Sequence, residues 1–293
     1  MTSRANSQAN SRVNSRARDK TIWQRVLVVF ALLVLVINGF YPIIWIFLTS
    51  IKNELELSTK PITYWPNDAS FKNYLEIFRA QPLARFFLNS LIVSSLSTVV
   101  CVIFAAFAAY ALARLKLRYR RAIAITITAA SMFPVVALII PLFQTMKSLG
   151  WLNTYLSLVI PYAAFSLPIS TLVLTAFFQG IPEDLESAAM IDGCSRFEAL
   201  WRIVVPLAAP GVVTAAILVF VNSWNEFLLA LTFNSAPDMK TVPVGVTLYQ
   251  GEFTFPWPLI SAAIVVTIIP VIAIIIVFQR KIISGLTAGG VKG

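Results

Sequence analysis

Few residues in this chain could do chemistry, and their positions are informative. The 293 residues include no histidine, which excludes imidazole metal sites and histidine proton relays. Neither Cys101, in an apolar stretch, nor Cys194 is placed to favour a disulfide. Of the 13 acidic residues, five gather in one segment: Glu183, Asp184, Glu186, Asp192 and Glu198. Glu226 is the only acid inside an apolar stretch, where a buried charge indicates function.

Glu226 lies beside two amides and an indole, from Asn222, Asn225 and Trp224. Amides hydrogen-bond sugar hydroxyls and an indole stacks on a sugar ring, so this cluster could line a solute pathway. The same groups could equally hold one membrane helix against another. The residues alone leave both interpretations open.

The composition is that of a membrane protein. Hydrophobic residues make up 58% of the chain and charged residues 12%, so a soluble domain of this size could not solvate its surface. A helix needs about 20 apolar residues to cross a hydrocarbon core of ~30 Å. Six uncharged windows can each hold such a helix: 26–51, 86–113, 122–146, 148–182, 203–225 and 253–279.

These windows lack the period-two alternation of a membrane β-barrel, and lipid cannot satisfy open backbone groups. We therefore expect an all-α membrane protein with six transmembrane helices, at 26–49, 86–112, 122–146, 157–179, 207–231 and 258–278. Prolines recur in these spans, for example Pro134 and Pro141 in the third. Each favours a kink; kinked helices could line a cavity that changes shape, although membrane helices also tolerate proline without such a role.

Basic residues indicate which side of the membrane each loop faces. Sixteen of the 23 Lys and Arg residues fall on the side that holds both termini, the loop 114–121 and the segment 180–206. The other side, with segments 50–85, 147–155 and 232–257, holds seven. Because cytoplasmic loops carry the excess of positive charge, we expect both termini in the cytoplasm.

Residues 1–21 form a low-complexity basic segment with the repeats SRANS and SRVNS. This composition predicts a disordered cytoplasmic tail. The apolar run that follows is too long for the core of a cleavable signal peptide. Because the basic tail is fused directly to a membrane helix, we expect no nucleic-acid partner.

The acidic segment 180–206 lies between two apolar windows and predicts two short helices joined by a turn. Pro182 suits the first position of a helix, where its missing N–H is not needed. Three acidic residues follow in the first turn, where the helix dipole favours negative charge. Asp192 and Gly193 form a turn pair.

Each of the two predicted helices has an apolar face. In the first, Leu185, Ala188 and Ala189 form a shallow face that a partner could approach closely. The second begins with a capping box of Ser195 and Glu198. Its apolar stripe consists of Phe197, Leu200, Trp201 and Val204, and we expect the helix to end at Pro206. Interfacial helices normally present Lys and Arg to anionic lipid, whereas this segment holds five acids and two bases, so docking to a protein is favoured.

The segment resembles the EAA loop of ABC importer permeases, whose pattern is E-A-A-x3-G-x9-I-x-L-P. Here Ser187-Ala188-Ala189 is followed by three residues, Gly193, nine residues and IVVP, so the spacing matches throughout. Ser187 replaces the glutamate of the pattern and Val205 replaces its leucine. The segments LESAAMIDG, SWNEF (223–227) and GLTAGGVKG (285–293) are similar to the sugar-importer branch, the maltose-type permeases.

The resemblance covers residues 22–293 and implies a six-span type I permease core with a cytoplasmic coupling helix in the loop 180–206. It implies that an ATPase-coupling site is formed by Glu186, Ser187, Ala188, Ala189, Asp192, Gly193 and Pro206. The carboxyl-terminal cytoplasmic tail 280–293 would extend into the ATPase dimer through the freedom of Gly285, Gly289 and Gly290, or would simply fray.

The resemblance also implies an assembly in the bacterial cytoplasmic membrane. Its other members would be a second homologous permease in a heterodimer, two copies of a cytoplasmic ATPase, and an extracytoplasmic sugar-binding protein. Segments 50–85 and 232–257 are candidate docking surfaces for the binding protein. The chain has no GxxxxGK[ST] loop, so we expect a non-catalytic subunit without a cofactor or metal of its own, with ATP and Mg on the partner ATPase.

The expected function is import of a sugar or an oligosaccharide, including an acidic one such as an alginate oligosaccharide. Two alternatives fit a six-span protein. A gradient-driven secondary transporter predicts intramembrane acid–base pairs and inverted repeats, but Glu226 is the only acid in a span and no repeat is evident. A non-transporting membrane scaffold predicts no dependence on an ATPase.

Overall fold

The computed structural model describes residues 2–251 and 254–288, with side chains described for 24–251 and 254–279. Every regular element in these residues is a helix. The long ones are α1 (Thr2–Ser50), α4 (Leu83–Arg114), α7 (Leu156–Gln179), α11 (Ala209–Asn225) and α14 (Trp257–Ala288). Shorter helices are α2 (Glu54–Leu57), α3 (Lys72–Ala80), α5 (Arg120–Ser131), α6 (Val135–Ser148), α8 (Glu183–Ile191), α9 (Arg196–Ala199), α10 (Val205–Leu207), α12 (Leu228–Phe233) and α13 (Val242–Thr247). A π-helix, η1 (Leu200–Val204), and a 3₁₀ turn, η2 (Pro237–Met239), complete the series.

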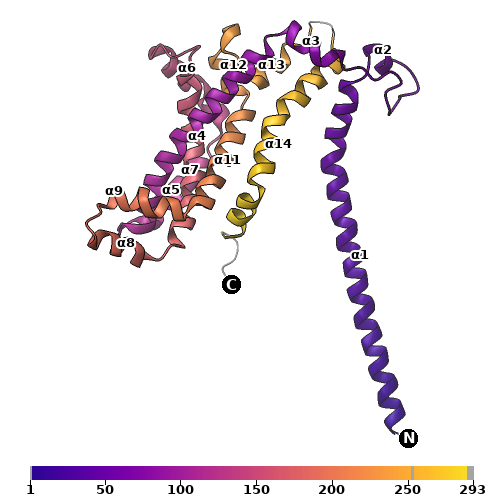
Figure 1. Ribbon diagram of the computed structural model, residues 1–293, viewed down its shortest axis with the longest axis vertical. Helices are drawn as coiled ribbons and strands as arrows, with labels where there is room; N and C mark the ends of the chain where they lie inside the picture. Colours follow the sequence, from indigo (N-terminus) through magenta and orange to yellow (C-terminus); the bar gives the residue numbers. More distant parts are fainter. Residues whose placement is uncertain (1, 252–253, 289–293) are drawn as a thin grey trace.

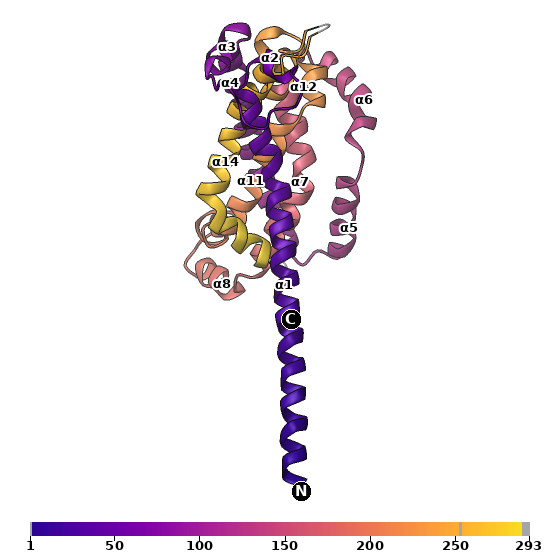
Figure 2. The ribbon, with the colours of Figure 1, turned by 90° about the vertical axis from the view of Figure 1, so that its right-hand side faces the viewer.

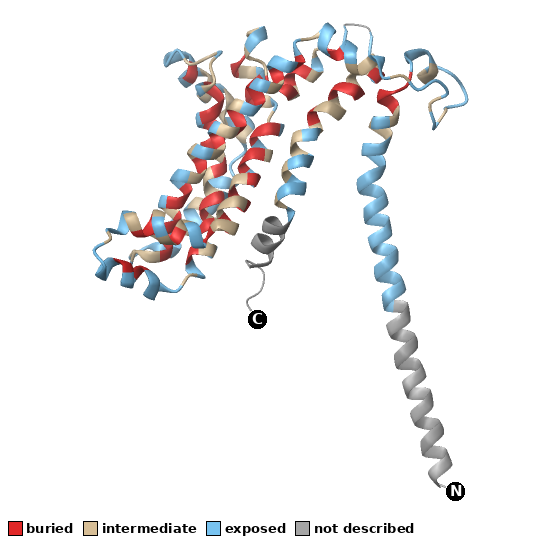
Figure 3. Ribbon diagram, viewed as in Figure 1, coloured by how far each residue is buried: buried red, intermediate tan, exposed pale blue. Residues whose placement is uncertain are grey.

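Three helices form the centre of the molecule. Helices α4, α7 and α11 pack on one another, and most of the buried residues lie on them (Figure 3). Small side chains bring α4 close to its neighbours, because Ala105 and Ala109 of α4 and Ala215 of α11 are fully buried. The outward faces of these helices are apolar and exposed, as is expected of helices that face lipid or another membrane subunit.

Helix α1 stands apart from this centre (Figure 1). It approaches α14 at its carboxyl-terminal end, and the apolar part of its span has no buried residue. The helix also continues through residues 2–21, where the sequence predicts a disordered tail. Extending an existing helix needs no new nucleus, so a polar segment that lacks a core of its own can still continue the helix that follows it.

The structure is compatible with up to six membrane spans, four of them single helices and two more if each of two bent helix pairs is one span. Four helical segments are long and apolar enough to cross a membrane: Gln24–Ser50, Leu83–Arg114, Leu156–Gln179 and Trp257–Gln279. The predicted third span, 122–146, is instead two helices, α5 and α6, at 87° to each other. Their break falls at Pro134, which cannot donate a helix hydrogen bond and disfavours helical geometry in the residue before it.

The predicted fifth span, 207–231, is also divided. The segment Arg196–Leu207 meets α11 at 83°, and α11 ends at Asn225, with Glu226 in an extended conformation before α12 begins. At 1.5 Å per residue, the 17 residues of α11 are about 25 Å long. The helix is therefore slightly shorter than a hydrocarbon core of ~30 Å, and α12 follows it as a separate helix.

The two ends of the molecule are clearly separated. Helices α8 and α9 lie at the same end as the amino-terminal end of α1 and the carboxyl-terminal end of α14 (Figure 1). Helices α3, α6, α12 and α13 lie at the opposite end, and Figure 2 shows α5 and α6 beside the central helices.

Helix α14 continues to Ala288, so Gly285 is helical rather than extended as predicted. Gly289 and Gly290 lie outside the described residues.

Candidate functional site

Helix α8 is the first of the two helices predicted in segment 180–206. It begins after Pro182, which is the cap residue rather than the first helical one, and three acids occupy its first turn. The negative charges lie where the backbone N–H groups have no partner within the helix. The predicted acidic helix is therefore present, with its charges where the helix dipole favours them.

The turn after α8 is a Schellman motif. The Gly193 N–H donates to the Met190 carbonyl at 3.2 Å, and the Cys194 N–H donates to the Ala189 carbonyl at 3.0 Å. Gly193 has φ of +93°, a conformation that side chains rarely adopt. No atom lies within 4 Å of the position of an added Cβ, so the backbone conformation alone requires glycine here.

The second helix starts with the predicted capping box. The Ser195 hydroxyl accepts from the Glu198 N–H, and the Glu198 carboxylate accepts from the Ser195 N–H at 2.9 Å. The prediction that Pro206 ends this helix is wrong, because α10 continues to Leu207 and the break falls at Ala208. The π-helix η1 ends two residues before Pro206, whose ring crowds the carbonyl four residues earlier.

The side chains of α8 divide into two sets. Asp184, Ser187, Ala188 and Ile191 follow a helical spacing of i, i+3, i+4 and i+7 and are all exposed; we call them the coupling face. Leu185 and Asp192 are exposed beside it. Ala189 is buried, which corrects the predicted face of Leu185, Ala188 and Ala189.

Glu186 is also buried, although the resemblance assigns it to the ATPase contact. Its carboxylate pairs with the guanidinium of Arg114 at the carboxyl-terminal end of α4, and the two side chains are only 5% and 6% exposed. The Tyr110 hydroxyl donates to the same carboxylate at 3.0 Å. Arg114 also donates to the Ile181 carbonyl at 2.8 Å. Glu186 therefore attaches α8 to α4 rather than presenting a charge on the surface.

Sequence reasoning counted Arg114 only as a sign of topology and did not consider Tyr110. The sequence does show that Tyr110 and Arg114 are four residues apart at the end of a membrane helix and so share one face, where they could bind a common partner. Only the fold shows that α8 returns to that face, so Glu186 could not be paired with them from sequence.

The residues proposed for the solute pathway have different environments. Asn222 and Asn225 are exposed on α11. Trp224 is 3% exposed; its ring packs between those of Phe87 and Phe220, at centroid distances of 5.2 and 5.7 Å. Stacking of this indole on a sugar ring is therefore excluded in this conformation, and Trp224 supports the helix that carries the two amides.

Glu226 lies in the break between α11 and α12 and caps α12. Its carboxylate accepts the N–H groups of Leu229 and Ala230 at 2.9 and 3.2 Å and also accepts the hydroxyl of Tyr162 on α7. Of the two interpretations of this acid, the geometry favours the one in which it holds helices together.

A cavity of about 300 Å³ lies beside Asn225, between α11, α13 and α14, and Thr267 also lines it.

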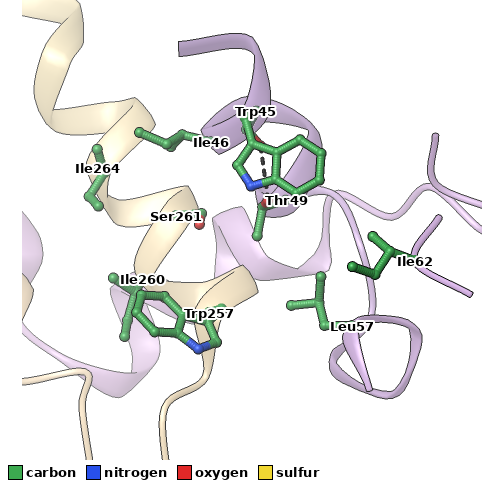
Figure 4. A pocket seen from close by; sticks show the side chains of 9 residues that line it. All are labelled: Trp45, Ile46, Thr49, Leu57, Ile62, Trp257, Ile260, Ser261 and Ile264. Carbon is green, nitrogen blue, oxygen red and sulfur yellow. Dashed lines mark hydrogen bonds between the residues drawn. The ribbon is translucent and has the colours of Figure 1, made fainter. Parts of the chain in front are cut away.

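A second pocket, of about 500 Å³, lies between α1, α14 and the segment after α1 (Figure 4). Trp45, Ile46, Trp257 and Ile260 are among the side chains that line it. The hydroxyl of Thr49, which also lines it, is already bonded to the Trp45 carbonyl. This apolar lining offers a sugar few hydrogen-bond partners.

A known family matches most of the membrane part of the chain. The family described as "Binding-protein-dependent transport system inner membrane component" matches residues 101–283, which include α8 and residues 222–226. The chain belongs to this family. The permease is thus a multi-pass, non-catalytic subunit of an ABC importer, which works with a binding protein and with a separate ATPase subunit.

Several relatives extend over nearly the whole permease. A sulfoquinovosyl glycerol transport system permease of Agrobacterium fabrum is 55% identical over 260 residues, which cover 89% of this chain and 91% of that protein. A trehalose/maltose transport system permease of Thermococcus litoralis is 37% identical over 275 residues, or 93% and 98% of the two chains. A crystal structure of a bacterial ABC transporter involved in import of the acidic polysaccharide alginate contains a chain with a TM-score of 0.78 and 25% identity, covering 90% and 97%.

Proposed function

We propose that the permease carries a sugar-containing solute across the bacterial cytoplasmic membrane, driven by ATP hydrolysis on an ATPase dimer that docks on α8. The relatives that support a sugar are named for sulfoquinovosyl glycerol and for trehalose and maltose, and a neighbouring structure belongs to an importer of an acidic polysaccharide. Sulfoquinovosyl glycerol, trehalose and alginate oligosaccharides are therefore the solutes to test first.

The proposed assembly contains a second, homologous permease in a heterodimer, two ATPase copies that bind ATP and Mg, and an extracytoplasmic binding protein. The exposed apolar surface of α1 supports a further membrane subunit, because the most apolar part of its span has no residue buried within this chain. For the binding protein we propose the outer segments 50–85 and 232–257. Tyr64, Trp65 and Phe71 of the first are each more than 60% exposed, and aromatic residues are enriched at protein interfaces.

We further propose that both termini and α8 face the cytoplasm. The support is the excess of basic residues on the side that holds the termini and segments 114–121 and 180–206, together with the position of α8 at the same end as both terminal helices. In this orientation the coupling face points toward a cytoplasmic ATPase. Asn222 and Asn225 then lie in the outer half of the membrane, near the end that receives solute.

The observation that carries this proposal is the division of α8 into an exposed face and a buried attachment. Asp184, Ser187, Ala188 and Ile191 are free to enter a cleft of the ATPase, with Asp192 and the Gly193 turn beside them. Glu186 and Ala189 face the membrane helices. A force applied to the exposed face therefore reaches the permease core through the buried one.

Substitution of the coupling face tests the docking site. Ala188→Arg places a long charged side chain on the exposed face, so we expect loss of ATPase co-purification and of ATP-dependent uptake while membrane insertion is retained. Ala80→Arg, an exposed alanine at the opposite end, is the matched control for ATPase co-purification and should retain it. Normal ATPase binding by Ala188→Arg would refute the docking role of this face.

A further inference from the structure

We propose that α4 moves as one rigid helix, here called the rod, and transmits a displacement of α8 to the outer end of the permease. The positioning residues are Tyr110 and Arg114 at its inner end and Asn89 and Ser90 at its outer end. The inference rests on the proposed function, because it assumes that an ATPase moves α8. It adds the path by which that movement reaches the side that receives solute.

The inner attachment of α4 is a desolvated ion pair. Among the side-chain hydrogen bonds of α8, those that reach another element come from Glu186, to Arg114 and Tyr110. Arg114 also holds the Ile181 carbonyl, so the start of α8 is fixed to the same side chain. Separating buried charges leaves each without a partner, which is strongly unfavourable. Helix α8 and the inner end of α4 should therefore move together.

The outer attachment is a second polar cluster on the same helix. The Asn89 amide donates to the carbonyls of Asp238 and Lys240 at 2.8 and 2.9 Å, and its oxygen accepts the Tyr155 hydroxyl at 2.9 Å. The Ser90 hydroxyl accepts the Val242 N–H at 2.8 Å. Asn89 is fully buried and Ser90 is 2% exposed. The outer end of α4 thus fixes the segment 237–242 and the start of α7.

The helix between these attachments is suited to transmit a displacement. Its 32 residues contain neither proline nor glycine and extend about 48 Å. By contrast, α1, α6, α7 and α14 each contain a proline inside the helix, where kinks are expected. Ala105, Ala106 and Ala109 are buried against the neighbouring helices, so the rod also lies at the centre of the core.

Two glycines on the lipid-facing side test the rod without touching either attachment. Val99 and Ile103 are 55% and 39% exposed and lie between the two clusters. Val99→Gly with Ile103→Gly lowers helix propensity there, whereas Val99→Ala with Ile103→Ala is the matched control. The measurements are solute moved per ATP hydrolysed in the complete importer, and labelling of Asp238→Cys from outside with and without trapped nucleotide.

We expect the alanine pair to behave like the wild type. The glycine pair should lower solute moved per ATP by at least about fivefold, the lower end of typical coupling between sites, and should abolish the response of position 238 to nucleotide while the ATPase stays bound. Asn89→Leu, which removes the attachment at the outer end of α4, should likewise lower solute moved per ATP and abolish the response of position 238 to nucleotide. Exchange of the inner charges, Arg114→Glu with Glu186→Arg, should recover part of the coupling that Glu186→Arg alone removes, which distinguishes positioning from folding.

If the wild-type importer shows ATP-dependent uptake and the glycine pair has the same solute moved per ATP and the same labelling, the role of α4 is overturned, but the proposed function is not. Absence of ATP-dependent uptake by the wild-type importer would overturn the proposed function and the inference with it. The wild-type measurement in the same experiment therefore separates the two failures.

Discussion

The environment of Glu226 decides how a single intramembrane acid is interpreted. The sequence identifies it correctly as an unusual charge inside an apolar stretch, but two roles remain open because its neighbours are not known. The structure supplies two backbone N–H groups and the Tyr162 hydroxyl as partners. All three depend on the break after Asn225, which lies inside what composition alone describes as one continuous span.

The role of Glu226 can be tested by comparing it with its partner. Glu226→Gln and Tyr162→Phe each weaken the same cluster of hydrogen bonds. We therefore expect each to lower the free energy of unfolding by a similar amount, on the order of 1 kcal/mol. Neither change should alter the solute concentration that gives half-maximal uptake. A tenfold rise of that concentration in Glu226→Gln, absent in Tyr162→Phe, would show instead that the carboxylate contacts solute.

At the scale of elements, apolar windows locate the membrane helices well because the bilayer sets a minimum length for each. Four of the six predicted spans are single helices. The sharp break at Pro134 was not predicted, because proline in a membrane helix can cause anything from a mild kink to a sharp break, and the neighbouring helices determine which occurs. The break at Glu226 was not predicted either, because no proline or glycine marks it. The motif spacing of segment 180–206 predicted both short helices, but the rotation that buries Glu186 and Ala189 depends on α4.

The turn that joins α8 to α9 depends on one glycine. A residue with a side chain at the φ of Gly193 costs about 1–2 kcal/mol, so Gly193→Val should weaken ATPase binding about tenfold or more. Asn tolerates such a conformation better, so Gly193→Asn should lie between Gly193→Val and wild type. Gly39→Ala, in α1 with open space around it, is the control. Equal binding by all three variants would contradict a requirement for this turn geometry.

For the whole molecule, the asymmetry of basic residues predicts which ends lie together, and the fold places α8 at the end where α1 begins and α14 ends. Chain composition cannot predict how far α1 stands from the core, because that depends on what surrounds the permease in the membrane. It also cannot specify the solute, because solute selectivity depends on a few side chains and their exact positions.

Cysteine labelling in intact cells tests the proposed orientation. Cys194 is partly exposed next to the Gly193 turn, whereas Cys101 is buried. We expect a membrane-impermeant thiol reagent to leave Cys194 unmodified until the cells are opened. Leu55→Cys, at a position 83% exposed in the outer segment, should react in intact cells. Labelling of Cys194 from outside would reverse the topology.

The most direct test of ATP-driven import is uptake by vesicles that contain the permease, its partner permease and the ATPase, with ATP inside and the loaded binding protein outside. We expect uptake of a sugar-containing solute that requires both ATP and the ATPase and is lost in Ala188→Arg. Uptake by the permease alone, driven by an ion or solute gradient with no ATPase present, would contradict this function.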